Sequence, residues 1–172
     1  KAPAGHFFID TDPNVPVVLI GGGIGITPMM SMLRWCIANQ PQRPLHLYYG
    51  LRNSDEHAFK STLEDMAASY PALRLNVVYS RPLAADGPGR DYQHSGHADV
   101  DLLRRSLPHG RHQFYVCGPP AMMQTLVPAL AEWGVPGAPR QPGDAVPLFD
   151  PSLAIGNYES GRPSADDACR IG

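Results

Sequence analysis

Along the chain, short apolar runs typical of buried strands alternate with stretches whose apolar residues recur at helical spacing. This pattern predicts alternating strands and helices. The runs Val17–Ile20 and Leu45–Tyr49 are short, mostly apolar and rich in branched or aromatic residues, as buried parallel strands are. Between them, Thr27–Asn39 has apolar residues at helical spacing, and Pro28 stands where the first turn of a helix tolerates proline. This part of the chain is therefore predicted to form a strand, a helix and a second strand.

The same alternation continues through most of the chain. Ser54–Tyr70 is predicted as a helix with Ser54 as its N-cap, and Phe59, Leu63 and Met66 share its apolar face. The later elements are a strand over Leu73–Tyr79, a loop over 80–98, a helix over Val100–Leu107, a strand over Gln113–Cys117 and a helix over Pro119–Trp133 that Gly134 ends. This order predicts an α/β fold, a doubly wound and mostly parallel sheet with helices on both faces.

After Gly134 the pattern stops, and the composition changes. Proline recurs every few residues, with only brief apolar stretches near Leu148 and Leu153. We therefore expect residues 137–172 to form an irregular C-terminal tail, because such a segment buries little apolar surface. The folded domain itself is expected to span residues 15–136.

The composition excludes several classes of protein. The net charge of the 172 residues is −2, and no stretch is strongly basic, so no nucleic-acid partner is expected. The most apolar window, residues 15–38, is too interrupted to cross a membrane, and no signal peptide is visible. The three cysteines, Cys36, Cys117 and Cys169, are odd in number and far apart, which favours a reducing, cytoplasmic location.

The loop after the first strand has the composition of an anion site. In doubly wound sheets ligands bind beyond the carboxyl ends of the strands, and here that loop holds Gly21, Gly22, Gly23 and Gly25. Glycine lets backbone N–H groups approach a phosphate closely at the positive end of a helix. The run matches the dinucleotide fingerprint only in part, so the loop alone leaves a nucleotide site and a tight structural turn open. Thr27 could cap the helix or reach a ligand.

The fourth strand ends in a second unusual stretch, FYVCGPPAMM. Cys117 and Gly118 lie at its carboxyl end, and Pro119 opens the next helix. A cysteine in this position is commonly a small core residue. Beside a glycine loop on a neighbouring strand, it could instead touch a bound ring.

Together, GGGIGITPMMSML, YYGLRNSDEHAF and FYVCGPPAMM resemble the nucleotide-binding domain of the ferredoxin–NADP reductase superfamily, which includes flavohaemoglobins and oxygenase reductases. The similarity covers about residues 1–135. It implies a ferredoxin reductase-like NAD(P)-binding domain, and residues 1–14 resemble the end of the flavin-binding domain that precedes it in the family. The cofactors implied are NADH or NADPH, together with FAD bound mainly by a domain absent from this chain.

The resemblance assigns roles to particular residues. The pyrophosphate would lie on Gly21, Gly22, Gly23, Gly25 and Thr27, and the nicotinamide near Thr27, Pro28, Cys117, Gly118 and Pro119, with Met122 packed nearby. Cys117 and Thr27 are the catalytic candidates, since they would help to place the hydride donor against the flavin. At the adenosine end, Arg52 follows the second strand, and the pair Ser80 and Arg81 after the third would bind a 2′-phosphate, which favours NADPH. The alternative for Arg81 is a solvated loop arginine.

The implied function is the NAD(P)H-binding part of a flavoprotein oxidoreductase that passes electrons to an iron–sulfur or haem acceptor. The alternative is a nucleotide-binding or interaction module without activity of its own. A self-contained short dehydrogenase is disfavoured because no tyrosine has lysine four residues later. No metal site is predicted, since the paired histidines at 94 and 97 and at 109 and 112 lack a suitably spaced cysteine or carboxylate.

Two features depart from the family pattern. The segment GAPRQPGDAV stands where members of the family continue into a further strand, and proline is poor strand material. The final ACRIG resembles the opening of a plant-type [2Fe–2S] motif, but no second or third cysteine follows Cys169, so no cluster can form with these ligands.

Overall fold

A computed structural model describes residues 7–135 and 154–159 of the chain. Its elements, in order, are β1 (Val17–Gly22), the 3₁₀ turn η1 (Gly23–Gly25), α1 (Ile26–Asn39), β2 (Leu45–Leu51), the 3₁₀ turn η2 (Ser54–Glu56), α2 (Lys60–Ser69), β3 (Leu73–Tyr79), β4 (His94–Ser95), α3 (Val100–Ser106), β5 (Arg111–Cys117), α4 (Pro120–Glu132) and β6 (Ala154–Glu159). The predicted α/β class is confirmed, because strands and helices alternate along the folded part, except that β4 follows β3 directly.

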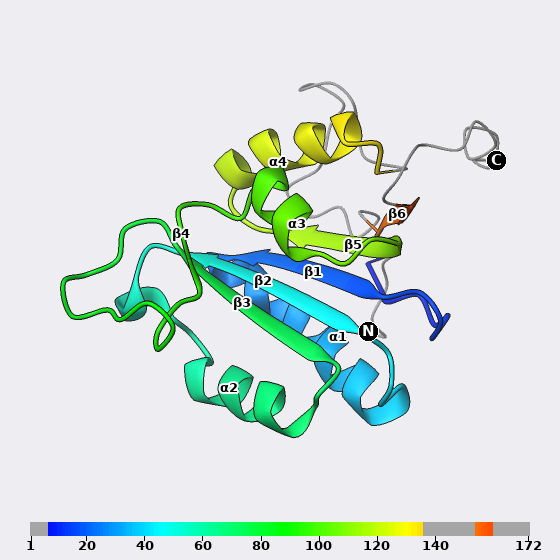
Figure 1. The fold of residues 1–172 in the computed structure, drawn as a ribbon, viewed down its shortest axis with the longest axis horizontal. Coiled ribbons are helices and arrows are strands. Elements are labelled where there is room, and N and C mark those ends of the chain that lie inside the picture. Colours follow the sequence, from blue (N-terminus) through cyan, green and yellow to red (C-terminus); the bar gives the residue numbers. More distant parts are fainter. Residues whose placement is uncertain (1–6, 136–153, 160–172) are drawn as a thin grey trace, which may run out of the picture.

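The strands form one sheet in the order β4-β3-β2-β1-β5-β6. The pairs from β4 to β5 are all parallel, and β6 pairs with β5 antiparallel. From β1 the chain builds the sheet outward through β2, β3 and β4, and then returns to place β5 on the other side of β1 (Figure 1). The strand order therefore reverses between β1 and β5, and a crevice beyond that point is where such sheets bind ligands.

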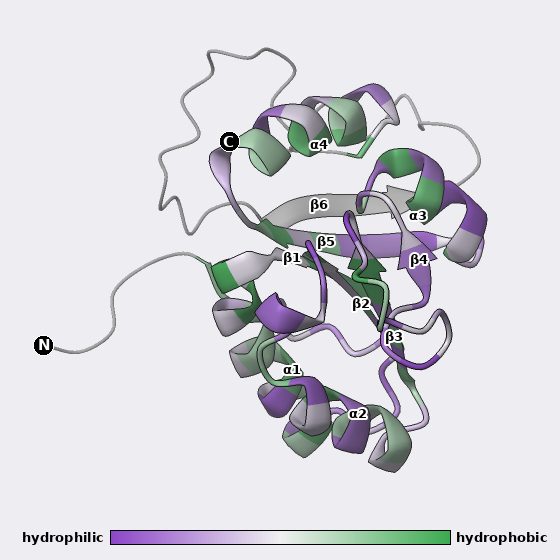
Figure 2. Ribbon diagram, turned by 90° about the vertical axis from the view of Figure 1, so that its left-hand side faces the viewer, coloured by the Kyte–Doolittle hydropathy of each residue, from purple (hydrophilic) through white to green (hydrophobic). Residues whose placement is uncertain are grey.

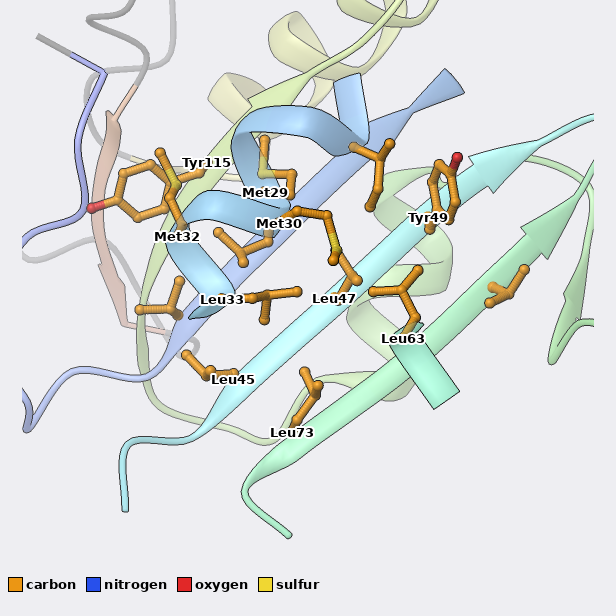
Figure 3. Close-up of a cluster of buried hydrophobic side chains, with 14 of the residues drawn as sticks. Met29, Met30, Met32, Leu33, Leu45, Leu47, Tyr49, Leu63, Leu73 and Tyr115 are labelled. Atoms are coloured by element: carbon orange, nitrogen blue, oxygen red, sulfur yellow. The ribbon is translucent and has the colours of Figure 1, made fainter. Parts of the chain in front are cut away.

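Helices cover both faces of the sheet. The helices α1 and α2 lie on one face, and α3 and α4 lie on the other (Figures 1 and 2). Between the first pair and the sheet lies a core of Met29, Met30, Leu33, Leu47, Leu63 and their neighbours, whose side chains fill the space under α1 (Figure 3). The other face is packed by a second cluster that includes Val18, Tyr48, Phe114, Leu126 and Leu130. This burial explains why the central strands are apolar on both sides.

The helix predicted over Ser54–Tyr70 is shorter than expected. Residues 54–56 form a 3₁₀ turn, and α2 begins only at Lys60 because Phe59 takes a left-handed conformation with φ 59°. The side chain of Asn53, and not Ser54, caps the turn by accepting a hydrogen bond from the backbone N–H of Asp55. Phe59, predicted to lie on the buried face, is 46% exposed. The spacing of apolar residues could not predict this break, because the break comes from the backbone conformation of Phe59.

Two strands depart from the sequence prediction. The predicted loop over 80–98 contains the short strand β4, which pairs with the end of β3. Within the segment predicted as an irregular tail, residues 154–159 form β6, which pairs along β5. The rest of that tail, including GAPRQPGDAV and Cys169, lies outside the described residues. Residues 7–14 contain no helix or strand, and the resemblance of residues 1–14 to the end of a flavin-binding domain stays a prediction.

Buried histidines make the stability of this fold dependent on pH. His46, only 6% exposed, has a pKa lowered to about 4, first by burial and then by the charges of His112 and Arg74. An unfolded histidine binds a proton near pH 6.5, so between about pH 6.5 and 4 the unfolded chain holds more protons than the folded one. The stability gained from neutral His46 is therefore present above pH 6.5 and lost as the pH falls through this window.

We expect the free energy of unfolding to fall by up to about 3 kcal/mol for His46 as the pH drops from 7 to 4. His57, whose pKa is also lowered to about 4, contributes in the same direction. Urea unfolding at pH 7 and at pH 5 measures the slope, and His46→Leu should make it shallower. An unchanged slope in this variant would contradict the assignment.

Candidate nucleotide-binding site

The glycine loop and the cysteine loop meet at the carboxyl edge of the sheet. β1 and β5 are parallel neighbours, and Gly21 pairs directly with Cys117 in their register. The backbone of η1 therefore leaves the sheet next to the backbone of Cys117 and Gly118. This is the point at which the strand order reverses, so the two sequence motifs flank the expected ligand crevice.

Three glycines lie where these two loops pack closely, Gly25 against backbone atoms and Gly22 and Gly118 mainly against the Met122 side chain. A Cβ on Gly25 would lie 2.1 Å from the carbonyl oxygen of Cys117. A Cβ on Gly22 would lie 2.4 Å from the sulfur of Met122 and 2.9 Å from Cδ of Pro119, and one on Gly118 would lie 2.7 Å from the same sulfur. Tight packing thus accounts for these positions, which is the structural alternative that the sequence left open.

Gly23 is different and is the position best suited to a ligand. Its φ is +52°, a conformation that side chains rarely adopt, and a Cβ on it would meet nothing within 4 Å. It begins η1, which runs directly into α1, and the first N–H groups of a helical segment have no carbonyl partner within it. Open space beside such N–H groups is what an anion site in a loop of this kind requires, so Gly23 stays the candidate position for a phosphate.

Thr27 and Pro28 lie at the start of α1, as predicted. The Thr27 hydroxyl donates a hydrogen bond of 3.0 Å to the carbonyl of Ile24 and is exposed. This bond runs back to the preceding turn and is not an N-cap, since α1 has no side-chain cap hydrogen bond. It leaves the hydroxyl oxygen able to accept a bond from a ligand. Met122 is half-buried on α4 against Gly22 and Gly118, so it packs both loops together.

Cys117 is half-buried at the end of β5. Burial raises the pKa of its thiol, so the sulfur is neutral at physiological pH. A neutral thiol is a poor nucleophile but a polarizable surface against which a ring can lie. The geometry therefore suits a residue that positions a bound ring and does not form a covalent bond.

The three residues predicted for the adenosine end come together on the neighbouring strands. The N–H groups of Ser80 and Arg81 donate to the carbonyls of Leu51 and Arg52, at 2.9 and 2.8 Å. These bonds extend the β2–β3 ladder and place Arg52 beside Arg81. The hydroxyl of Ser80 donates to the carbonyl of Leu51 at 3.3 Å, so it is held against the backbone.

Acidic residues that the sequence did not point to surround this end of the site. Glu56 forms an ion pair of 3.3 Å with Arg52 on the protein surface. The carboxylate of Asp86 accepts hydrogen bonds from the N–H groups of Leu83 and Ser54. The side chain of Ser54 first, and then these N–H groups, hold the pKa of Asp86 below its usual range. Tyr49, Tyr79 and His57 were not predicted to lie near the site either, because only the β2–β3 register brings these positions together. One signal was available for Glu56, its i,i+4 spacing from Arg52.

A separate polar cavity of about 300 Å³ lies at the edge of the sheet, between β4 and α3. Its lining includes His94, His97 and Arg105, and none of the predicted site residues contributes to it. Among residues 7–135, no group of three or more metal-ligating side chains gathers in one place. Across the described parts of the chain, no helix is long and apolar enough to cross a membrane.

A family model and a curated relative both match most of the folded part of this chain. The model of the oxidoreductase NAD-binding domain family matches residues 19–127. A flavohemoprotein of Rhizobium meliloti is 37% identical over 134 residues, which cover 78% of this chain and 33% of the relative. The chain therefore spans about a third of the length of that relative.

Solved structures of related flavoproteins also resemble this chain in fold. The flavohem-like FAD/NAD binding domain of a nitric oxide dioxygenase from Vibrio cholerae is 32% identical with a TM-score of 0.66, over 80% of this chain and 53% of that one. A flavohemoglobin from Malassezia yamatoensis, solved with bound FAD and heme, is 28% identical with a TM-score of 0.58, over 72% of this chain and 30% of that one. The resemblance seen in the sequence motifs is thus confirmed, and the chain belongs to the oxidoreductase NAD-binding domain family.

Proposed function

We propose that this chain binds NADH or NADPH along the carboxyl edge of its sheet and presents the nicotinamide to a flavin held mainly by another domain. One observation carries the proposal: the glycine loop and the Cys117 loop lie side by side where the strand order reverses. The family assignment supports a dinucleotide as the ligand. The open space beside Gly23 supports a pyrophosphate site at this loop.

The residues of this chain would act by binding and orientation. FAD, when bound, supplies the redox chemistry by accepting a hydride. The N–H groups around Gly23 hold the pyrophosphate, and the neutral Cys117 sulfur, with the backbone of Gly118 and Pro119, forms a wall for the nicotinamide ring. Thr27 accepts a hydrogen bond from the cofactor through its hydroxyl oxygen. The gain in rate comes from holding the donor carbon in one orientation.

Electrons would pass from the flavin to a haem acceptor. The relatives named above favour haem, since one is a flavohemoprotein and another was solved with heme. An iron–sulfur acceptor is the second candidate, on the sequence resemblance to oxygenase reductases. The alternative is a nucleotide-binding or interaction module without activity of its own, which would not reduce a flavin in the experiment that follows.

Titration of the chain with NADH and NADPH, followed by hydride transfer after addition of the flavin domain of a flavohaemoglobin relative, tests the proposal. We expect binding of at least one cofactor and flavin reduction on mixing. Cys117→Ala should slow flavin reduction about tenfold or more while changing cofactor affinity little, because it disturbs orientation and not the phosphate site. Binding without reduction favours the inactive module, and no binding of either cofactor refutes the proposal.

At the adenosine end we expect a preference for NADPH that depends on Arg81. This side chain is exposed, and Arg52 beside it is paired with Glu56, so Arg81 is the cation better placed to meet a 2′-phosphate. Arg81→Ala should weaken NADPH binding about 10- to 100-fold and NADH binding less than about twofold. Arg111→Ala, at the opposite end of the sheet, is the control with the same loss of charge. Equal losses for both cofactors in Arg81→Ala would refute the 2′-phosphate contact.

A further inference from the structure

Two loops frame the adenosine end of the proposed site and are joined to each other at several points. The first loop, residues 52–59, connects β2 to α2, and the second, residues 80–92, leads from β3 toward β4. Both begin with the ladder bonds that place Arg52 beside Arg81. Neither loop contains an α-helix or a strand of its own, so their shape depends on the contacts between them.

Near the surface, two polar contacts join the first loop and the start of α2 to the second loop. The carboxylate of Asp86 in the second loop accepts from the N–H of Ser54 in the first, at 3.4 Å. The ammonium group of Lys60, at the start of α2, pairs with Asp91, which also binds the N–H of Gly87 and the guanidinium of Arg90. Asp91 is only 9% exposed, so this carboxylate is a fixed point for the second loop.

Beneath these contacts lies a hydrogen bond between two ring side chains. Nδ1 of His57 in the first loop lies 2.7 Å from the hydroxyl of Tyr79, the last residue of β3 and the one directly before Ser80. Tyr79 is fully buried and stacks on Tyr92 at the far end of the second loop, with ring centroids 5.0 Å apart. Tyr49, also fully buried, lies edge-on against the His57 ring at 5.5 Å.

We propose that His57 is a positioning residue for the adenosine half of the cofactor, because its hydrogen bond to Tyr79 fixes the two loops that carry Arg52 and Arg81. The inference rests on the proposed function. His57 does not reach the ligand itself but acts through the loops. Without the bond, the first loop is attached to the second by the surface contacts and the ladder alone, and the spacing of the two guanidinium groups loosens.

The protonation state of His57 supports this role. Burial lowers its pKa to about 4, the charge of Lys60 acts in the same direction, and the charge of Asp91 opposes it. Burial also raises the pKa of Tyr79 to about 12. Both side chains are therefore neutral at physiological pH, and the contact is one hydrogen bond between neutral groups. Nε2 of His57 is buried and has no hydrogen-bond partner among the residues that the structure describes, so this side chain depends on its Nδ1 bond.

Because His57 depends on its Nδ1 hydrogen bond, variants that remove or keep this one bond can test the proposal. His57→Leu and Tyr79→Phe each remove the hydrogen bond, whereas His57→Asn places an amide group where Nδ1 lies and dispenses with the unpartnered Nε2. Tyr48→Phe is the matched control. Tyr48 is next to Tyr49 in β2 and fully buried, but its hydroxyl bonds Ser106 of α3 on the other face of the sheet, also at 2.7 Å. Tyr48→Phe thus removes a hydroxyl in a buried hydrogen bond of the same length from the neighbouring strand, without touching either loop.

The measurement is the dissociation constant of ADP, of 2′,5′-ADP and of NADPH for the full chain, taken well below each variant's melting temperature. Binding of these probes to the unmodified chain tests the proposed function, and the differences among variants test the role of His57. We expect His57→Leu and Tyr79→Phe to weaken 2′,5′-ADP and NADPH about 5- to 20-fold and ADP less, with His57→Asn within about twofold of the original. Tyr48→Phe should lower the melting temperature without changing any of the three constants.

Three results would overturn the proposal while leaving the proposed function intact. One is unchanged affinity in Tyr79→Phe, the variant that keeps the ring and so is the more certain to fold. Another is a loss of affinity in Tyr48→Phe as large as that in Tyr79→Phe, which would mark a general effect of destabilisation. The third is failure of His57→Asn to retain affinity when its melting temperature is unchanged.

Discussion

Replacing Gly25 by alanine is expected to destabilise the fold by about 3 kcal/mol and to abolish tight binding of the dinucleotide. The added Cβ would lie 2.1 Å from the carbonyl oxygen of Cys117, 2.5 Å from its carbonyl carbon and 2.9 Å from the nitrogen of Gly118. All three are backbone atoms at the end of a central strand, so no side-chain rotation relieves the overlap. Either η1 or the end of β5 must move, and both belong to the proposed cofactor site.

Gly50→Ala is the control for this variant. Gly50, the second-to-last residue of β2, pairs with Gly22 in the sheet register and has no positive φ of the left-handed kind. Its added Cβ would come no nearer than 3.8 Å to the carbonyl oxygen of Gly21. Urea unfolding and cofactor titration of both variants measure the difference. Comparable stability and affinity in Gly25→Ala and Gly50→Ala would show that the close approach of the two loops is not needed.

The second large effect is expected from a residue outside the site. Arg43 is 1% exposed and donates hydrogen bonds to the carbonyls of Val15 and Asp10 and to the side-chain oxygens of Gln40 and Gln113, at 2.6 to 3.0 Å. It fastens the segment before β1 to the start of β5. Arg43→Met keeps much of the side-chain volume but leaves these oxygens without a hydrogen-bond donor, and two of the lost bonds are fully buried. We therefore expect the free energy of unfolding to fall by about 4 kcal/mol.

Thermal and urea unfolding check this value. Arg34→Met is the comparison, because Arg34 is exposed on α1 and carries the same charge. We expect this variant to stay within about 0.5 kcal/mol of the original protein. A loss in Arg43→Met no greater than that in Arg34→Met would mean that water replaces the guanidinium at these oxygens.

Local patterns were enough to predict the central strands and the glycine-led helix. A buried parallel strand needs a short apolar run, and a helix that covers it needs apolar residues at its own period, so both are written in adjacent residues. The break between η2 and α2 was missed because it depends on the left-handed backbone at Phe59, which spacing does not encode. The strand β4 was missed because two residues carry too little pattern to predict a strand.

The candidate site was predicted in its composition but not in its geometry. The sequence named Gly25, Gly118 and Met122, yet it could not show that their roles are to let two loops touch. His57 and Tyr79 could not be paired from their spacing, since they come into contact only through the register of β2 with β3. Arg43 had no signal of burial, because a charged residue in a loop is ordinarily exposed.

The amino-acid sequence by itself determined the α/β class, the family and the two loops that meet at the proposed site, since short-range patterns and motifs carry this information. Tertiary structure alone decided which glycines are closely packed and which, Gly23, has open space beside it. It also decided how the adenosine end is held. The physical reason is that these properties are distances between segments far apart in the chain, and strand order and register set such distances.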